Sequence, residues 1–186
     1  MTATRLEWLA RLIPPLAFAL VVAAGLYVFG TEHVPDYSGT ALFGRTATDT
    51  LSLKSWLATG LLALAGLQLG LALWMYGKLP GAAAGSRTGN VHRAVGIVAL
   101  LVSLPIAYHC AFAYGVQTNI DARVAVHSLA GCFRYGAFAA KLVIVRSRRL
   151  PGWALPLAGG TLVALVAVLW YSSALWYFND DSLPLL

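Results

Sequence analysis

The sequence predicts an all-α, polytopic membrane protein: a bundle of five transmembrane helices in a single integral membrane domain, residues 1–186. Of its 186 residues, 59% are hydrophobic and only 11% are charged, whereas soluble domains have about 25% charged residues. The apolar stretches are much longer than the roughly 10-residue alternating strands of an outer-membrane barrel. A chain of this length has room for four to six spans of about 20 residues each and for no soluble catalytic domain.

The predicted spans cover residues 12–30, 55–76, 94–116, 123–145 and 153–178. The first follows Arg5 and Arg11, and Pro14-Pro15 fits the first turn of a helix. Its length of about 19 residues exceeds the roughly 7–15 apolar residues of a signal peptide, so we expect an uncleaved signal anchor.

The second and fifth spans are bounded by interfacial aromatic residues. Trp56, Trp74 and Tyr76 mark the ends of the second span, and Trp153 and Trp176 mark those of the fifth, as expected of aromatic belts. The third and fourth spans are joined by a short polar connection, residues 117–122, so they are expected to be neighbouring antiparallel helices. The connection 31–53 is the longest and could be a lid or a plain connector.

The charge distribution predicts the orientation. Nine of the 13 basic residues flank the predicted spans on one side: Arg5, Arg11, Lys78, Arg87, Arg93, Lys141, Arg146, Arg148 and Arg149. Six of the seven acidic residues fall on the other side. By the positive-inside rule, the N-terminus is inside and the C-terminus outside, in a plasma (inner) membrane. The net charge of +6 therefore reflects topology and a membrane-lipid environment, and it does not indicate a nucleic-acid partner.

Histidines within spans are the main functional signal, because polar residues inside a membrane are costly. His109 lies about 10 Å and His127 about 6 Å from the outer ends of the third and fourth spans. Two facing imidazoles at similar depth suit the two axial positions of a haem iron, whereas zinc or copper would want more ligands. The alternative for either histidine is a hydrogen bond to a neighbouring helix.

Two histidines begin the pattern His-x-x-x-Gly, which places both residues on one helical face. They are His92 with Gly96 and His127 with Gly131. A glycine one turn from a ligand leaves a flat notch in which a porphyrin can approach the backbone. Ordinary packing through small residues explains the pattern equally simply.

These residues resemble the cytochrome b-561 family. The segment His92-Arg-Ala-Val-Gly-Ile-Val-Ala-Leu resembles the opening of a helix in that family, and His127-Ser-Leu-Ala-Gly131 is similar to the corresponding element of the next helix. The resemblance covers spans two to four. It implies a membrane haem-b protein that moves electrons, in this family through two bis-histidine haems.

The sequence departs from the family because its first two spans contain no histidine. We therefore expect one haem b on the outer side, held by His109 and His127. His92 is then an interfacial polar residue, or it ligates a second, inner haem with an unexpected partner such as Met75, since Met/His ligation occurs in cytochromes.

Arg134 lies near the middle of the fourth span, where a charge is costly unless it finds a partner. A haem propionate, a quinone carbonyl or a ring of backbone carbonyls could be the partner of its guanidinium. Seven residues separate it from His127, which returns it to nearly the same helical face. Lys54 and Arg123 could meet propionates or an anionic donor, or they could be snorkelling interfacial cations.

The sequence thus predicts a membrane b-type cytochrome, an electron-transfer protein or oxidoreductase subunit. The expected partner is an extracytoplasmic redox protein or a quinol. Two other interpretations stay open: a haem-free anchor or scaffold of a larger complex, and a small transporter in which the histidines and Arg134 form a proton relay. The lack of any Asp or Glu within the spans counts against the relay.

Overall fold

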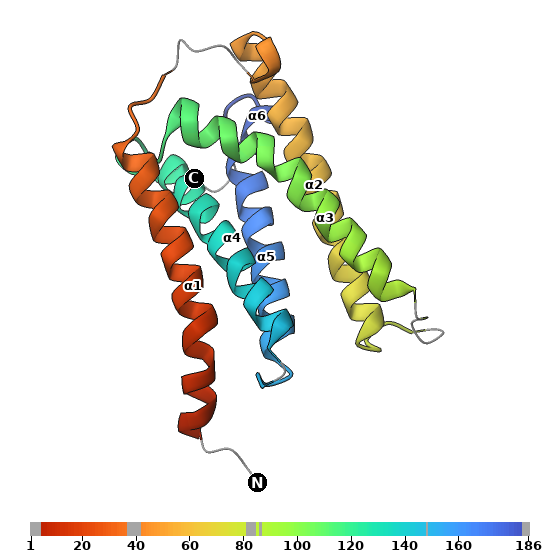
Figure 1. Cartoon of the computed structure of the whole chain (residues 1–186). Coiled ribbons are helices and arrows are strands. Elements are labelled where there is room, and N and C mark those ends of the chain that lie inside the picture. Colours follow the sequence, from red (N-terminus) through yellow and green to blue (C-terminus); the bar gives the residue numbers. More distant parts are fainter. Residues whose placement is uncertain (1–4, 37–41, 81–84, 86, 148, 184–186) are drawn as a thin grey trace.

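The computed structural model describes the chain except residues 1–4, 37–41, 81–84, 86, 148 and 184–186 (Figure 1). The part described is all-helical and confirms five helices long and apolar enough to cross a membrane. They are α1 (Arg5–Glu32), α2 (Ala47–Met75), α3 (Thr88–His109), α4 (Ala122–Arg146) and α5 (Ala154–Trp170). A short 3-10 turn, η1 (Leu42–Gly44), precedes α2. The side chain of Arg5, Arg148, and part of the connection 31–53 lie outside the described residues.

Two helices that begin earlier than hydropathy predicts, α2 and α4, are capped by polar side chains. Helix α2 starts at Ala47, where the Thr46 hydroxyl accepts a hydrogen bond of 3.2 Å from the backbone N–H of Asp49. Helix α4 starts at Ala122, where the Asp121 carboxylate accepts one of 2.7 Å from the N–H of Val124. Side-chain oxygens at this position satisfy N–H groups that have no partner within the helix.

Two of the helices end in π-helical turns. Helix α3 continues as η2 (Cys110–Tyr114), and α5 continues as η3 (Tyr171–Leu175) followed by the short α6 (Trp176–Phe178). Such turns are rare and are frequent at functional sites. Both lie at the same end of the bundle, where the acidic residues Glu32, Asp49 and Asp121 also lie, and we call it the acidic end. The opposite end, where α1 begins and where α2–α3 and α4–α5 are connected, is the basic end.

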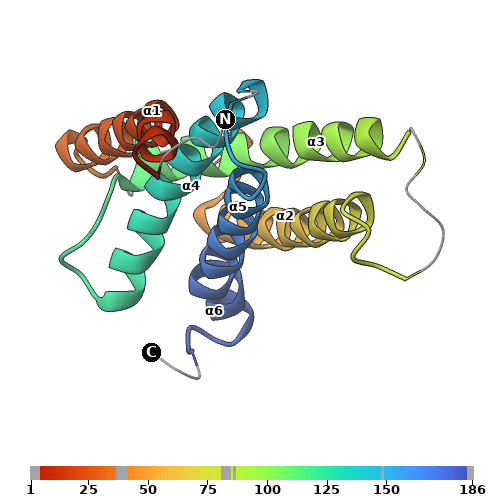
Figure 2. The same ribbon diagram turned by 90° about the horizontal axis from the view of Figure 1, so that it is seen from below.

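The five helices pack in the order α1, α4, α5, α2, α3 (Figures 1 and 2). Helix α4 packs against α1 on one side and α5 on the other, and α2 packs against α5 and α3. Helices α3 and α4 follow each other in the chain but do not form a closely packed pair. The expectation that they are direct neighbours therefore holds only at their connection, and the space between them is bridged by side chains.

Small residues bring α1 and α4 together. A side-chain carbon added at Gly136 of α4 would lie 2.5 Å from the carbonyl oxygen of Ala19 and 3.1 Å from the Cβ of Ala23, both on α1. Backbones approach this closely in membranes only where side chains are small, and dispersion contacts then hold the helices. Gly136 therefore fixes the position of α1.

The acidic end of α1 is fastened to the chain that follows η2. The N–H of Val116 donates to the carbonyl of Gly30 at 2.9 Å, and the N–H of Asp36 donates to that of Ala113 at 2.9 Å. Gly115 has a φ of +66°, and a Cβ there would lie 2.6 Å from the Gly30 oxygen. Only glycine combines this conformation with this approach. The contact holds the end of α3 over α1.

We predict that Gly136→Ala destabilises the protein, because the new methyl group forces α1 and α4 apart. Overpacking of this kind typically costs about 1–3 kcal/mol, which corresponds to a fall in melting temperature of about 2–12 °C for a chain of this size. Thermal unfolding of the purified protein measures it. Gly66→Ala on α2 is the control, because nothing lies within 4 Å of its added carbon. A Gly136→Ala protein as stable as the control would contradict the assigned α1–α4 contact.

Candidate functional site

A cavity of about 530 Å³ lies between α3 and α4 at the acidic end. This is within the range of about 300–1,000 Å³ that is usual for small-molecule sites. Residues of α1, α2, η2, α4, η3 and α6 complete its wall. The lining side chains with polar or sulfur atoms are Lys54, Ser55, Cys110, Tyr114, Gln117, Arg123, His127, Ser128, Cys132, Tyr135, Ser173 and Trp176.

A hydrogen-bonded bridge holds the two helices on either side of the cavity. The hydroxyl of Tyr135 on α4 lies 3.1 Å from Ser103 Oγ and 3.2 Å from the Ser103 carbonyl oxygen on α3. Ser103 in turn donates from its hydroxyl to the carbonyl of Leu100 at 2.7 Å. With that proton used, Ser103 Oγ accepts from Tyr135. The bridge spans the gap without closing it, since Tyr135 also lines the cavity.

His127 lines the cavity, and its neighbour Ser172 fixes its tautomer. His127 Nδ1 lies 3.0 Å from Ser172 Oγ, and that hydroxyl lies 2.7 Å from the carbonyl oxygen of Val168. A hydroxyl has one proton to donate, and a carbonyl can only accept. Ser172 therefore donates to Val168 and accepts from Nδ1–H of His127. The lone pair of the neutral imidazole is then on Nε2, which is the arrangement found for histidines that bind metals.

The two predicted glycine notches differ. Gly131, one turn from His127, lines the cavity, and a Cβ added there would have nothing within 4 Å. The notch at Gly96 is filled instead. A Cβ at Gly96 would lie 3.2 Å from the side-chain nitrogen of Gln68, which donates to the carbonyl of His92. Only the glycine beside His127 leaves room for a planar ligand.

His109 lies beside the cavity but is not among its lining residues. It is 8% exposed, and its Nδ1 lies 3.3 Å from the ammonium of Lys54, which is also 8% exposed. The ring packs edge-on against Tyr114, with centroids 5.2 Å apart. A charged Lys can only donate, so Nδ1 accepts and Nε2 carries the proton. His109 thus has the opposite tautomer to His127 and reaches the cavity through Lys54 and Tyr114.

The cavity wall carries two permanent or near-permanent cations. Lys54 lies 4.3 Å from the centre of the Tyr114 ring, and Arg123 donates to the carbonyl of Ser172 at 3.0 Å while stacking 4.0 Å over Trp176. No Asp or Glu is among the described residues that line the cavity. A low-dielectric cavity with uncompensated positive charge favours ligands that carry carboxylates or other anionic groups.

The other predicted site residues lie away from this cavity. The guanidinium of Arg134 lies 4.9 Å from the centre of the Tyr135 ring and is not in the cavity wall. His92 is at the basic end, and its Nδ1 is buried with no hydrogen-bond partner in the described part of the chain. His33 binds the carbonyl of Phe112 and so helps to fasten α1 to η2. Met75 is 38% exposed at the end of α2.

Within the described ranges, no cluster of three or more His, Cys, Asp or Glu side chains could hold a metal ion. A haem iron needs only one or two axial ligands from the protein, because the porphyrin supplies the other four. The absence of such a cluster among the described residues therefore does not test His109 and His127 as haem ligands.

Sequence reasoning missed the partners of the histidines. Ser172 is a serine in an apolar span, 45 residues from His127, and nothing in the pattern of either helix connects them. Gln68 and Tyr135 were also passed over, although each is a polar side chain within a span. Polar residues at membrane depth need partners in neighbouring helices. Their position within apolar spans was therefore the one sign in the sequence that these three side chains have partners.

Comparisons with known proteins identify the family of the chain. No curated protein and no solved structure matches it. A family described as a family of unknown function, DUF6529, matches residues 12–185. The match includes α1 from Leu12 onward, the other four membrane-spanning helices, and every residue of the cavity described above. The chain therefore belongs to the DUF6529 family.

Proposed function

We propose that the chain is a membrane-embedded b-type cytochrome that carries electrons through one haem b in the cavity between α3 and α4. The observation that carries the proposal is His127, which lines the cavity with Nδ1–H bound to Ser172 and Nε2 left to accept a metal. Bound there, haem would supply a one-electron redox centre in a low-dielectric site.

The residues around His127 fit this group. Gly131 leaves open space one turn away, where the face of a porphyrin can approach the helix. Lys54 and Arg123 offer two cations to the two propionates, in a wall without acidic side chains among the described residues. Tyr114 and Trp176 add aromatic surface. The protein's own part is to bind and orient the group, to exclude water from it, and to balance its charge.

His109 is the proposed second axial ligand. Its Nδ1 is engaged by Lys54, so this contact must be given up before the opposite nitrogen can lose its proton to become a ligand. A carboxylate in the cavity is a stronger partner for an ammonium group than a neutral imidazole is. Anionic groups beside Lys54 would thus release His109. The filled notch at Gly96 favours a single haem, with His92 as an interfacial residue.

The orientation and location belong to the same proposal. The basic end faces the cytoplasm and the acidic end faces outward, in a plasma (inner) membrane, since basic residues accumulate on the cytoplasmic side of short loops. The cavity then opens toward the extracytoplasmic half of the bilayer. An extracytoplasmic redox protein or a quinol is the proposed electron partner, with a quinone as a further occupant of the cavity.

One observation also favours a second function. A cavity lined by Lys54 and Arg123 without described acidic residues would suit a small organic anion that is transported and not reduced. A haem-free anchor subunit is the remaining alternative. The absorption spectrum of the purified protein separates both from the cytochrome, because neither predicts a haem-b spectrum.

We predict that the purified protein has a haem-b spectrum and that His127→Ala abolishes it, since the porphyrin loses its axial ligand in the cavity wall. His109→Ala should retain haem but convert the iron from low-spin to high-spin, because one imidazole then remains. Optical and electron paramagnetic resonance spectra measure both. His33→Ala, at a histidine held by a backbone carbonyl of η2, is the matched control.

A wild-type spectrum from His127→Ala would exclude this residue as the ligand. A low-spin spectrum from His109→Ala would mean that another side chain fills the sixth position. A wild-type protein reconstituted with haemin that shows no haem-b spectrum would reject the cytochrome and leave the transporter and the anchor.

A second prediction concerns Ser172. Ser172→Ala should lower haem affinity about 10–100-fold, as is usual when the hydrogen-bond partner of a ligating histidine is removed. Ser172→Thr keeps the hydroxyl and should keep the affinity. Ser173→Ala is the control, because Ser173 lines the cavity but donates to the carbonyl of Leu169. Haemin titration of each variant measures the effect, and equal affinities for Ser172→Ala and Ser173→Ala would contradict the assigned tautomer.

The third prediction concerns topology. A reporter fused after Leu186 should be extracytoplasmic and one inserted at Gly85 cytoplasmic, because the charge asymmetry places the basic end inside. Paired alkaline phosphatase and green fluorescent protein fusions report on the two sides. Both reporters on one side would contradict the five-helix topology, and a reversed pair would contradict the orientation alone.

A further inference from the structure

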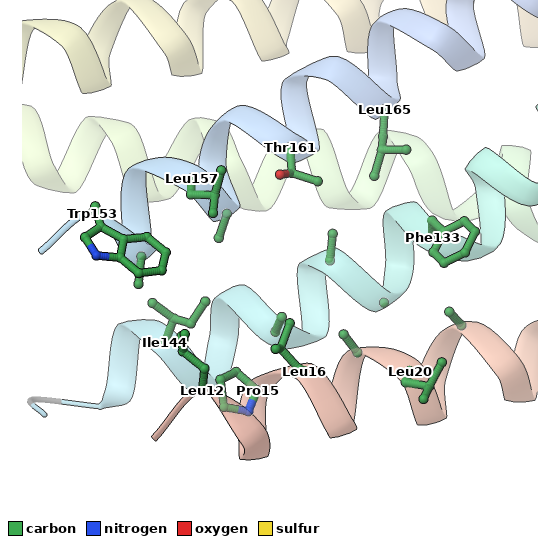
Figure 3. A pocket seen from close by; sticks show the side chains of 17 residues that line it. Leu12, Pro15, Leu16, Leu20, Phe133, Ile144, Trp153, Leu157, Thr161 and Leu165 are labelled. Atoms are coloured by element: carbon green, nitrogen blue, oxygen red, sulfur yellow. The ribbon is translucent and has the colours of Figure 1, made fainter. Parts of the chain in front are cut away.

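A second cavity is an apolar groove of about 610 Å³ at the basic end, open on one side (Figure 3). Helix α4 lies between α1 and α5 and forms its floor, and the other two helices form its walls. Leu12, Leu16 and Leu20 of α1, one turn apart, line one wall. Leu157 and Leu165 of α5 line the other. Among the described residues that line the groove, only Thr161 and Trp153 have side chains with polar atoms.

The middle of the floor is made of small residues, between Phe133 and Ile144 at its two ends. Gly136, Ala137 and Ala140 of α4 keep the surface low between two walls of larger side chains. The exposed fractions of Leu16 and Leu157 are 62% and 60%, so both walls reach the outside of the bundle. In a bilayer the open side of the groove faces the hydrocarbon chains of the lipids, so lipid chains can enter it.

The depth of the groove corresponds to one leaflet. It extends from Leu12 to Ala23 on α1 and from Phe133 to Ile144 on α4, which is about 16 Å at 1.5 Å per residue. The hydrocarbon core of a bilayer is about 30 Å thick. The groove thus covers about half of the core, beginning at the basic end.

Arginines lie in the chain close to the residues that line the groove at the basic end. Arg11 precedes the lining residue Leu12, and its Nη1 donates to the carbonyl of Arg149 at 3.2 Å. This bond ties the start of α1 to the connection between α4 and α5. Arg146 follows the lining residue Ile144 and donates to the carbonyl of Leu142 at 3.4 Å. The acidic residue nearest to these arginines in the sequence is Glu7, one helical turn before Arg11.

We propose that this groove binds one anionic phospholipid from the leaflet at the basic end. One acyl chain lies between the leucines of α1 and α5, and Arg11, Arg146 and Arg149 balance the net negative charge of the headgroup. The apolar lining selects the chain, the depth selects one leaflet, and the charge at the mouth selects an anionic headgroup. The site is on the opposite side of α4 from the haem cavity and does not depend on the proposed function.

The test compares two lipids with identical acyl chains, phosphatidylglycerol and phosphatidylcholine, on the full chain purified in detergent. Native mass spectrometry gives the affinity of each bound lipid. A basic residue near a membrane surface contributes about fivefold to the binding of anionic lipid. The double variant Arg146→Gln, Arg149→Gln should therefore lose about 25-fold in affinity for phosphatidylglycerol and little for phosphatidylcholine.

Three controls make the result specific. Arg87→Gln removes a cation at the same end of the bundle but in the α2–α3 connection, and it should leave both affinities unchanged. The double variant Arg146→Lys, Arg149→Lys should keep the preference for phosphatidylglycerol. Ala158→Phe fills the groove and should lower both affinities more than tenfold, whereas Ala167→Phe, exposed on α5 outside the groove, should not. Circular dichroism checks that each variant is folded.

Equal wild-type affinities for the two lipids would overturn the proposal, as would a double Gln variant that behaves like Arg87→Gln. Retention of phosphatidylglycerol by a folded Ala158→Phe protein would place the lipid elsewhere. A dimer that Ala158→Phe dissociates would show that a second copy of the chain covers the groove. The measured lipid affinities do not depend on whether haem is bound. A negative result for the lipid can therefore be distinguished from a negative result for the proposed cytochrome.

Discussion

The separation of α3 from α4 is the constraint on which the rest of the site depends. Neither helix is free to close the gap, because each is held by contacts outside it. Helix α3 packs along α2, and the Gly30–Gly115 contact holds its end over α1. Helix α4 is held by α1 at Gly136 and by α5. The cavity is therefore a consequence of packing elsewhere, and the Tyr135–Ser103 bridge sets its width.

The second constraint is that polar groups in hydrocarbon must find partners within the protein. The π-helical turn η3 supplies two of them from one residue. The carbonyl of Ser172 accepts from Arg123, and its hydroxyl accepts from His127. One irregular turn thus holds a cation in the cavity wall and selects the tautomer of the histidine beside it. On the opposite wall of the cavity, the π-helical turn η2 places Tyr114 in contact with Lys54 and His109.

Hydropathy was sufficient to predict five helices, because each span is a long apolar run. It could not predict where α2 begins, since the Thr46 cap is a local hydrogen bond in a polar segment. For His109 and His127, the rise per residue predicted their depth. The direction in which each histidine side chain points was harder to predict than its depth, because that direction depends on which helices pack together. The connection 117–122 suggested that α3 and α4 pack directly, and the structure instead turns His109 toward Lys54 on α2.

The two His-x-x-x-Gly segments show why a local pattern cannot decide a binding site. His92 with Gly96 and His127 with Gly131 have the same spacing and the same helical geometry. Gln68 on α2 fills the notch in the first pair, while nothing approaches the second within 4 Å. That difference is set by a helix more than 20 residues away in the chain, so it is decided by tertiary packing.

Helix α4 separates two sites of different chemistry, and the spacing of its glycines explains how. Gly131 opens to the cationic cavity, and Gly136 touches α1 in the floor of the apolar groove. Five residues correspond to about 140° around a helix, so the two glycines lie on nearly opposite faces. The same helix can then face a charged, hydrogen-bonded interior near the acidic end and a lipid-filled groove near the basic end. Because the faces differ, a substitution in one wall leaves the other wall intact, and the two proposed ligands can be tested independently in one protein.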